Sequence, residues 1–181
     1  MESKATGSSR TGWLYAGLAA AVFAAGALAF FIGRMTADDA SPSGLAARQA
    51  DAATRGSTVM PFDLEQTSHT FQKRSDGGLQ TVTADDPNNA EQVALIRGHV
   101  SAEAQRFAAG DFSDPAGIHG AAMPGLAELS ASAGAITIEY SDVPAGAAIR
   151  YATGDVALVS ALHLWFDAQV SDHGQHASHG D

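Results

Sequence analysis

The sequence predicts an α+β domain made of two hairpin-plus-helix units. A pair of strand-like segments precedes each of two long amphipathic segments. Both long segments contain a motif of the form H-x3-[E/D]-A-Q, which runs from His99 to Gln105 and again from His163 to Gln169. The order ββα–loop–ββα predicts a four-stranded antiparallel sheet with two helices on one face, related by a pseudo-twofold axis.

In the first unit, residues 67–73 and 79–84 are expected to be strands. The segment Ser75-Asp76-Gly77-Gly78 is expected to be their turn, since glycine permits positive φ. Asp86-Pro87 has the residue types of a helix start, with Asp as the cap and Pro at the first helical position. Gly110 is expected to end that helix.

In the second unit, a loop rich in Pro and Gly occupies residues 111–125, and a short helical turn follows at 126–131. Residues 136–140 and 148–152 are the expected third and fourth strands. Asp155 is expected to cap the second long helix, which continues to about residue 171.

The chain before this domain is predicted to anchor it in a membrane. The uncharged run Trp13–Ile32 holds 20 residues, and a helix of that length crosses roughly 30 Å of hydrocarbon. The expected order is a cytoplasmic N-terminus (1–11), a single transmembrane helix (12–33), a disordered linker (34–59) and an extracytoplasmic domain (60–172). The alternative is a signal peptide cleaved near Ala27-Leu28-Ala29, which would leave a secreted protein.

The acidic composition of the domain limits the kinds of molecule that it is expected to bind. From residue 60 to the end, sixteen acidic residues stand against five basic ones. This excess of negative charge argues against nucleic acid as a partner and favours cations. The chain has seven His and no Cys, so a metal would be held by nitrogen and oxygen ligands, with Met sulfur as the soft donor.

The predicted metal ligands are imidazoles that lie far apart in the sequence. His69 shares a strand face with Phe71, and His119 precedes Met123 by four residues in the loop. The candidate ligands are His69, His99, His119, His163 and Met123. The alternative is a structural role, in which His99 and His163 form hydrogen bonds, Met123 anchors the loop on the core and His119 is solvated. Glu103 and Asp167 each follow a histidine by one helical turn, so each could hold a ligand ring in one tautomer. A weaker site is expected in the tail, residues 173–181, at His173, His176 and His179.

Three stretches resemble small bacterial exported proteins that are often called aspartate carbamoyltransferases. They are Pro61–Leu64 with His69-Thr70-Phe71, Gly110–Leu126 with His119, and Ala161–Gly174 with His163. The resemblance implies an exported domain over about residues 60–176. It does not imply carbamoyl transfer, because that activity belongs to two-domain α/β enzymes that bind anionic substrates with Ser-Thr-Arg-Thr and several further basic residues. Here only Ser9-Arg10-Thr11 is similar, and it precedes the apolar run.

The sequence therefore favours a membrane-anchored protein that binds copper or zinc through histidine, without catalysis. One alternative is a non-catalytic accessory subunit of a membrane complex, which an exposed apolar patch around Trp165 or Phe112 would favour. A second alternative is a metal-assisted hydrolytic enzyme.

Overall fold

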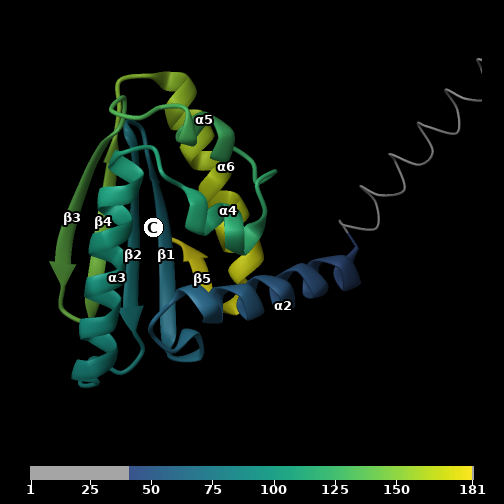
Figure 1. The fold of residues 1–181 in the computed structure, drawn as a ribbon, viewed down its shortest axis with the longest axis vertical. Coiled ribbons are helices and arrows are strands. Elements are labelled where there is room, and N and C mark those ends of the chain that lie inside the picture. The colour runs from purple at the N-terminus through teal and green to yellow at the C-terminus, as the bar shows by residue number, and fades with distance from the viewer. Residues whose placement is uncertain (1–40, 181) are drawn as a thin grey trace, which may run out of the picture. The chain divides into compact units, whose positions relative to one another are not determined.

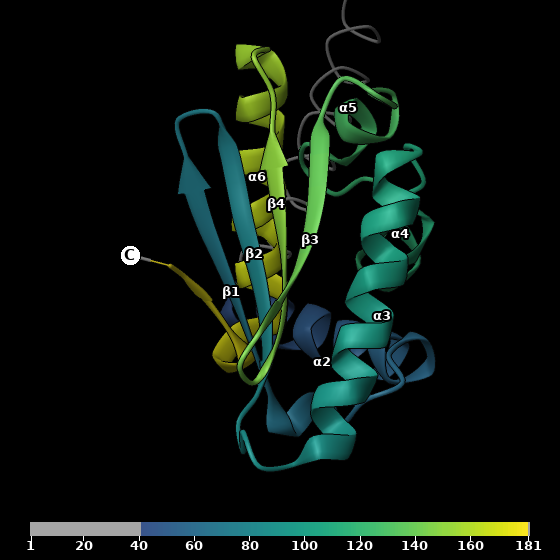
Figure 2. The same ribbon diagram turned by 90° about the vertical axis from the view of Figure 1, so that its left-hand side faces the viewer.

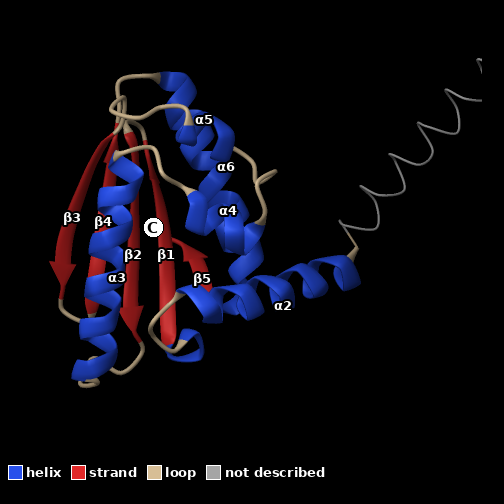
Figure 3. Ribbon diagram, viewed as in Figure 1, coloured by secondary structure: helices blue, strands red, loops and turns tan. Residues whose placement is uncertain are grey.

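The computed structural model describes residues 41–180. The predicted N-terminus, transmembrane helix and cleavage site, and residues 34–40 of the predicted linker, lie outside the described residues. The chain divides after Gly44, and the unit Leu45–Asp181 holds the whole sheet. In order, the elements are α2 (Pro42–Val59), the 3-10 turn η1 (Leu64–Gln66), β1 (Thr67–Arg74), β2 (Gly77–Ala84), α3 (Ala90–Ala108), α4 (Ser113–His119), α5 (Leu126–Ser130), β3 (Thr137–Val143), β4 (Gly146–Ala152), α6 (Val156–His173), the 3-10 turn η2 (Gly174–His176) and β5 (Ala177–His179) (Figures 1 and 3).

The sheet has five strands in the order β3-β4-β2-β1-β5 (Figure 1). The prediction of four strands was wrong, because the C-terminal tail adds β5 parallel to β1, with His69 opposite Ala177. The predicted α+β class is confirmed, but the sheet is mixed rather than purely antiparallel.

The two predicted hairpins lie side by side and repeat with one offset. Arg74 pairs with Gly77 at the end of the first hairpin, and Val143 pairs with Gly146 in the second, 69 positions later. The central β2·β4 pairing joins residues 77–83 to 146–152 in antiparallel order, and the second range is the first one shifted by 69 positions. This shared offset supports a duplicated hairpin, although the offset between the helical motifs that begin at His99 and His163 is only 64 positions.

Helices α3 and α6 pack on the same face of this twisted sheet, seen from the β3 edge in Figure 2. α3 lies over β3, β4 and β2, whereas α6 lies over β2, β1 and β5. Tyr151 of β4 joins the two, since its ring contacts Phe107 of α3 and Trp165 of α6. The most fully buried large side chains are Phe71, Ile96, Ile118, Leu129, Ile149, Tyr151, Leu162, Trp165 and Phe166.

Three local predictions need correction. α3 begins at Ala90 rather than at Pro87, because the Asn89 side chain, not that of Asp86, accepts the hydrogen bond from the Gln92 amide. The loop predicted at 111–125 contains a seven-residue helix, α4. Residues 42–59 form α2 instead of a disordered linker. Alanine, which is frequent there, has the highest intrinsic helix propensity, and that compensates for the lack of large apolar side chains.

Candidate functional site

A cluster of histidines lies where β1, α4 and α6 meet. The ring centres of His69 and His173 are 4.8 Å apart, and those of His119 and His173 are 5.0 Å apart, both edge to face. His69 is only 6% exposed, and the His119 side chain is 2% exposed. The prediction placed His69 and His119 among the ligands but assigned His173 to a loose tail. The structure brings these three rings together.

Local sequence explains how each ring is placed. The strand alternation of β1 turns Thr67, His69 and Phe71 toward the helices, and all three are buried. His119 and His173 are each the last residue of a helix and are each followed by a glycine with positive φ. A helix C-terminus carries partial negative charge, so both positions favour a neighbouring cation.

Hydrogen bonds fix two of the three rings. The Nδ1 of His119 lies 3.1 Å from Oδ2 of Asp172, a carboxylate that also pairs with Arg48 at 3.7 Å. The Nε2 of His173 lies 3.2 Å from Oε1 of Gln169. When Nδ1–H of His119 donates to Asp172, the Nε2 nitrogen keeps its lone pair. The amide oxygen of Gln169 similarly directs the lone pair of His173 to Nδ1.

The third ring lacks such a partner. Nδ1 of His69 is buried and has no hydrogen-bond partner within the described residues. Leaving a buried polar nitrogen unpaired costs about 1–3 kcal/mol, so an arrangement of this kind indicates a ligand, an ion or a bound water.

Burial keeps His69 and His173 neutral. It is the largest of the causes that lower the pKa of His69 to about 4, and the neighbouring His119, His176 and His99 act in the same direction. Burial also lowers the pKa of His173 well below its usual value, with additional effects from the same cluster. Neutral imidazole is the form that binds metal ions, and His69 and His173 are neutral at pH 7.

Two cavities meet at the cluster and share Met60, His69 and His173 in their walls. The first, of about 50 Å³, extends between α3, α4 and the sheet past Phe62 and Trp165. It has room for one or two water molecules. The indole Nε1 of Trp165 is the second buried polar atom that has no partner in the part of the chain described. The second cavity, of about 240 Å³, lies beneath α2.

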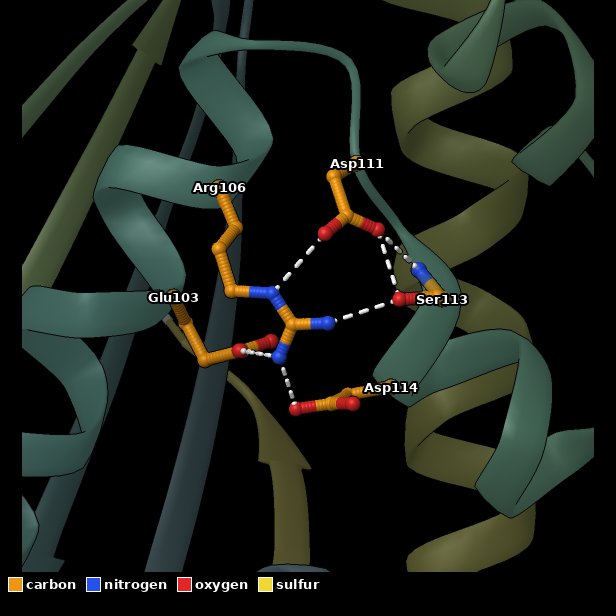
Figure 4. Close-up of polar contacts among 5 residues, drawn as sticks. All are labelled: Glu103, Arg106, Asp111, Ser113 and Asp114. Atoms are coloured by element: carbon orange, nitrogen blue, oxygen red, sulfur yellow. Dashed lines mark hydrogen bonds and ion pairs between the residues drawn. The ribbon is translucent and has the colours of Figure 1, made fainter.

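The far end of the first cavity carries a charged network, drawn in Figure 4. The Arg106 guanidinium binds the carboxyl groups of Glu103 at 3.1 Å, Asp111 at 3.0 Å and Asp114, and also the Ser113 hydroxyl at 2.6 Å. Burial, with a further contribution from Asp114, raises the pKa of Glu103 to about 7. Glu103 and Asp114 line the cavity, as does His99, whose ring centre lies 5.6 Å from that of Phe62.

Other predicted ligands lie elsewhere. The Nε2 of His163 lies 2.9 Å from the Gly77 carbonyl and 3.1 Å from that of Arg74, so it holds the β1–β2 turn. Met123 is buried in the apolar core. Neither residue lines the two cavities that contain His69.

The remaining predicted residues form surface pairs. Asp167 pairs with Lys73 at 2.5 Å and with Nε2 of His179 at 3.5 Å. His176 pairs with Glu65, also at 3.5 Å. The predicted loose tail is thus folded through residue 180, and its three histidines have separate surroundings.

Sequence reasoning missed Asp172, Gln169 and Met60. The first two precede His173 by one and four positions, and four positions is the helical spacing that brings a side chain to its partner. The glycines that follow His119 and His173 were the available signal that both residues end helices. Nothing in the sequence near Met60 points to the cluster.

Comparison with protein-family models, with curated protein sequences and with solved structures finds no match to this chain. Within residues 41–180, no three His, Asp or Glu side chains are already arranged to hold a metal ion. In the same range, no helix has both the length and the apolar character needed to cross a bilayer.

Proposed function

We propose that this protein binds a transition-metal ion, copper or zinc, through the imidazoles of His69, His119 and His173. The observation that carries the proposal is the buried, unpartnered Nδ1 of His69 in ring contact with a second neutral imidazole. A metal ion would satisfy that nitrogen and offset the cost of burying it.

The spacing of the rings supports a shared ion. Three imidazoles that each place a nitrogen about 2.0–2.1 Å from one tetrahedral ion have ring centres about 5 Å apart. The two ring separations here are 4.8 and 5.0 Å. The rings meet edge to face, so binding requires these side chains to rotate.

The surroundings favour copper or zinc over hard cations. Imidazole nitrogens suit these two metals, whereas calcium and magnesium prefer oxygen ligands. Asp172 would hold the His119 ring in the tautomer that binds through Nε2. The Met60 thioether, at the wall of both cavities, would favour copper over zinc if it joined the ligands.

We also propose that the N-terminal apolar run anchors this domain on the extracytoplasmic side of a bacterial membrane. The support is the sequence alone: the uncharged run Trp13–Ile32 and the resemblance to exported proteins. An anchored metal-binding domain could serve one membrane complex by holding its ion close to the surface.

A second candidate function is metal-assisted hydrolysis. The observation that favours it is Glu103, whose pKa of about 7 suits a general acid or base, in the cavity that also contains His69. The accessory-subunit alternative has less support, because Trp165 and Phe112 are 1% and 3% exposed and form no surface patch.

The test is a metal titration of the full-length chain in a mild detergent with Cu(II), Cu(I) and Zn(II). We expect one tight site, which is lost in His69→Ala and in His173→Ala. His163→Ala and His179→Ala are matched controls and should bind as the parent protein does. Weak binding that survives loss of His69 but not of His179 would contradict the proposal.

A further inference from the structure

The second cavity connects the histidine cluster to the protein surface. Its wall includes the buried His69 and His173 as well as the pair Glu65–His176. The His176 Nε2 and Glu65 Oε2 atoms are 3.5 Å apart. The side chain of Glu65 is 74% exposed, and that of His176 is 27% exposed. The pair is therefore accessible to ions in solution, whereas His69 is not.

The two 3-10 turns bring this pair together. Glu65 belongs to η1, just before β1, and His176 ends η2, just after α6. α2 forms the opposite wall of the cavity and is held by two hydrogen bonds. The Gln49 amide donates to the Ser171 carbonyl at 2.8 Å, and the Arg55 guanidinium donates to the Ile118 carbonyl at 2.5 Å.

We propose that Glu65 and His176 form an outer cation-binding site, from which the ion passes through the cavity beneath α2 to the buried imidazoles. The inference rests on the proposed metal binding at His69, His119 and His173, and it adds the access route. A buried site needs such a route, and a carboxylate with an imidazole is a ligand pair that copper and zinc accept. Two protein ligands hold an ion loosely enough to release it inward.

Size favours this cavity over the first one, at about 240 Å³ against about 50 Å³. The carboxyl groups at the polar end of the first cavity already bind the Arg106 guanidinium. Asp172 and Met60 also line the second cavity, and they offer a further carboxylate and a thioether. Each group is a possible intermediate contact for a metal ion.

The structure supplies a matched control pair. His179 and Asp167 also form a surface histidine–carboxylate pair with an N–O distance of 3.5 Å, and it does not line the second cavity. Removing that pair changes the net charge by the same amount. A difference in metal-loading rate between the two double variants would therefore be due to the location of the pair and not to the change in net charge.

The experiment measures the rate of Co(II) loading by stopped-flow absorbance and the equilibrium affinity by titration, on the full-length chain. In the Glu65→Ala/His176→Ala variant we expect loading to slow about tenfold, the lower end of what local charge does to association rates. The equilibrium affinity should stay within about threefold of the parent value, because a route changes rates rather than equilibria. The Asp167→Ala/His179→Ala control should load at the parental rate, and circular dichroism should show both variants folded.

The outcomes separate the two proposals. If the parent protein binds no Co(II) and no Zn(II), the proposed function fails and the access route fails with it. If the parent binds but the Glu65/His176 variant loads at the parental rate, or slows no more than the control, only the route is overturned. If that variant loses equilibrium binding, His176 is itself a ligand of the buried site, which also overturns the route.

Discussion

His119 and Asp172 are joined across two helices by a contact of 3.1 Å between Nδ1 and Oδ2. The contact ties the end of α4 to the end of α6 and orients one ring of the cluster. Arg48 of α2 approaches the same carboxylate at 3.7 Å. Three segments that are distant in sequence thus meet at one carboxyl group, which makes it the most informative position for mutation.

Asp172→Ala should weaken metal binding without abolishing it. Loss of a carboxylate that orients a metal-binding histidine typically lowers affinity 10–100-fold, so we expect a loss of about that size. Asp172→Asn should lose less, because its amide oxygen can still accept from Nδ1–H. Isothermal titration calorimetry with Zn(II) measures the affinity of both variants.

Asp167→Ala is the control, since that carboxylate pairs with Lys73 and His179 on the surface. We expect parental affinity. A loss equal to that of Asp172→Ala would mean that overall negative charge, and not orientation of His119, determines the affinity.

Without metal, the free energy of unfolding should fall as the pH falls from about 6.5 to about 4. The folded-state pKa of His69 is about 4, below the unfolded value of 6.5, so the unfolded chain binds the proton first and acid favours unfolding. A shift of this size corresponds to roughly 3 kcal/mol by pH 4. His173 acts in the same direction. Glu103 acts oppositely, because its raised pKa contributes stability at low pH that is lost toward pH 7.

Urea unfolding at several pH values, in the presence of a chelator, measures this dependence. His69→Gln should show a shallower slope between pH 6.5 and 4, since glutamine does not titrate, and His179→Gln should keep the parental slope. Parallel curves for the parent protein and His69→Gln would show that His69 is already accessible to protons in the folded state.

Local pattern predicted the hairpins but not the elements that depend on distant partners. The alternation of Thr67, His69 and Phe71 and the glycine after the turn were sufficient for the first hairpin. β5 has only three residues, one of them serine and one histidine, and it is a strand because β1 offers it a free edge. No local signal exists for such pairing.

Only part of the histidine cluster could be predicted, because the rest also depends on partners that are distant in the sequence. The strand face of His69 and the loop position of His119 were visible in the sequence. The sequence did not show which end of α6 contacts β1, because this depends on the direction in which the helix crosses the sheet. His163 and His173 are ten residues apart on α6, and the observed packing brings the second, not the first, to His69.

Arg106→Gln should destabilise the protein more at pH 8 than at pH 5. The guanidinium binds Glu103, Asp111 and Asp114, and losing hydrogen bonds to charged groups costs about 2 kcal/mol. At pH 5 the loss should be smaller, because Glu103, with a pKa of about 7, is already protonated. Thermal unfolding at the two pH values measures the difference. Arg74 donates to the Gln72 side chain in exposed hydrogen bonds, so Arg74→Gln should show little change at either pH. A pH-independent loss in Arg106→Gln would contradict the charge argument.

Gly125→Ala should cost more stability than Gly134→Ala, although the two glycines have nearly the same φ, 77° and 78°. Both variants incur the left-handed backbone penalty of about 1–2 kcal/mol. At Gly134 a Cβ would meet nothing within 4 Å, whereas at Gly125 it would overlap the carbonyl oxygen of Ala161 in α6. Overpacking of this kind adds about 1–3 kcal/mol, which urea unfolding resolves. Because Ala161 precedes His173 on α6, a displaced helix should also weaken metal binding in Gly125→Ala. Equal stability losses in the two variants would mean that α6 moves aside freely, and the rigid placement of His173 would then have no basis.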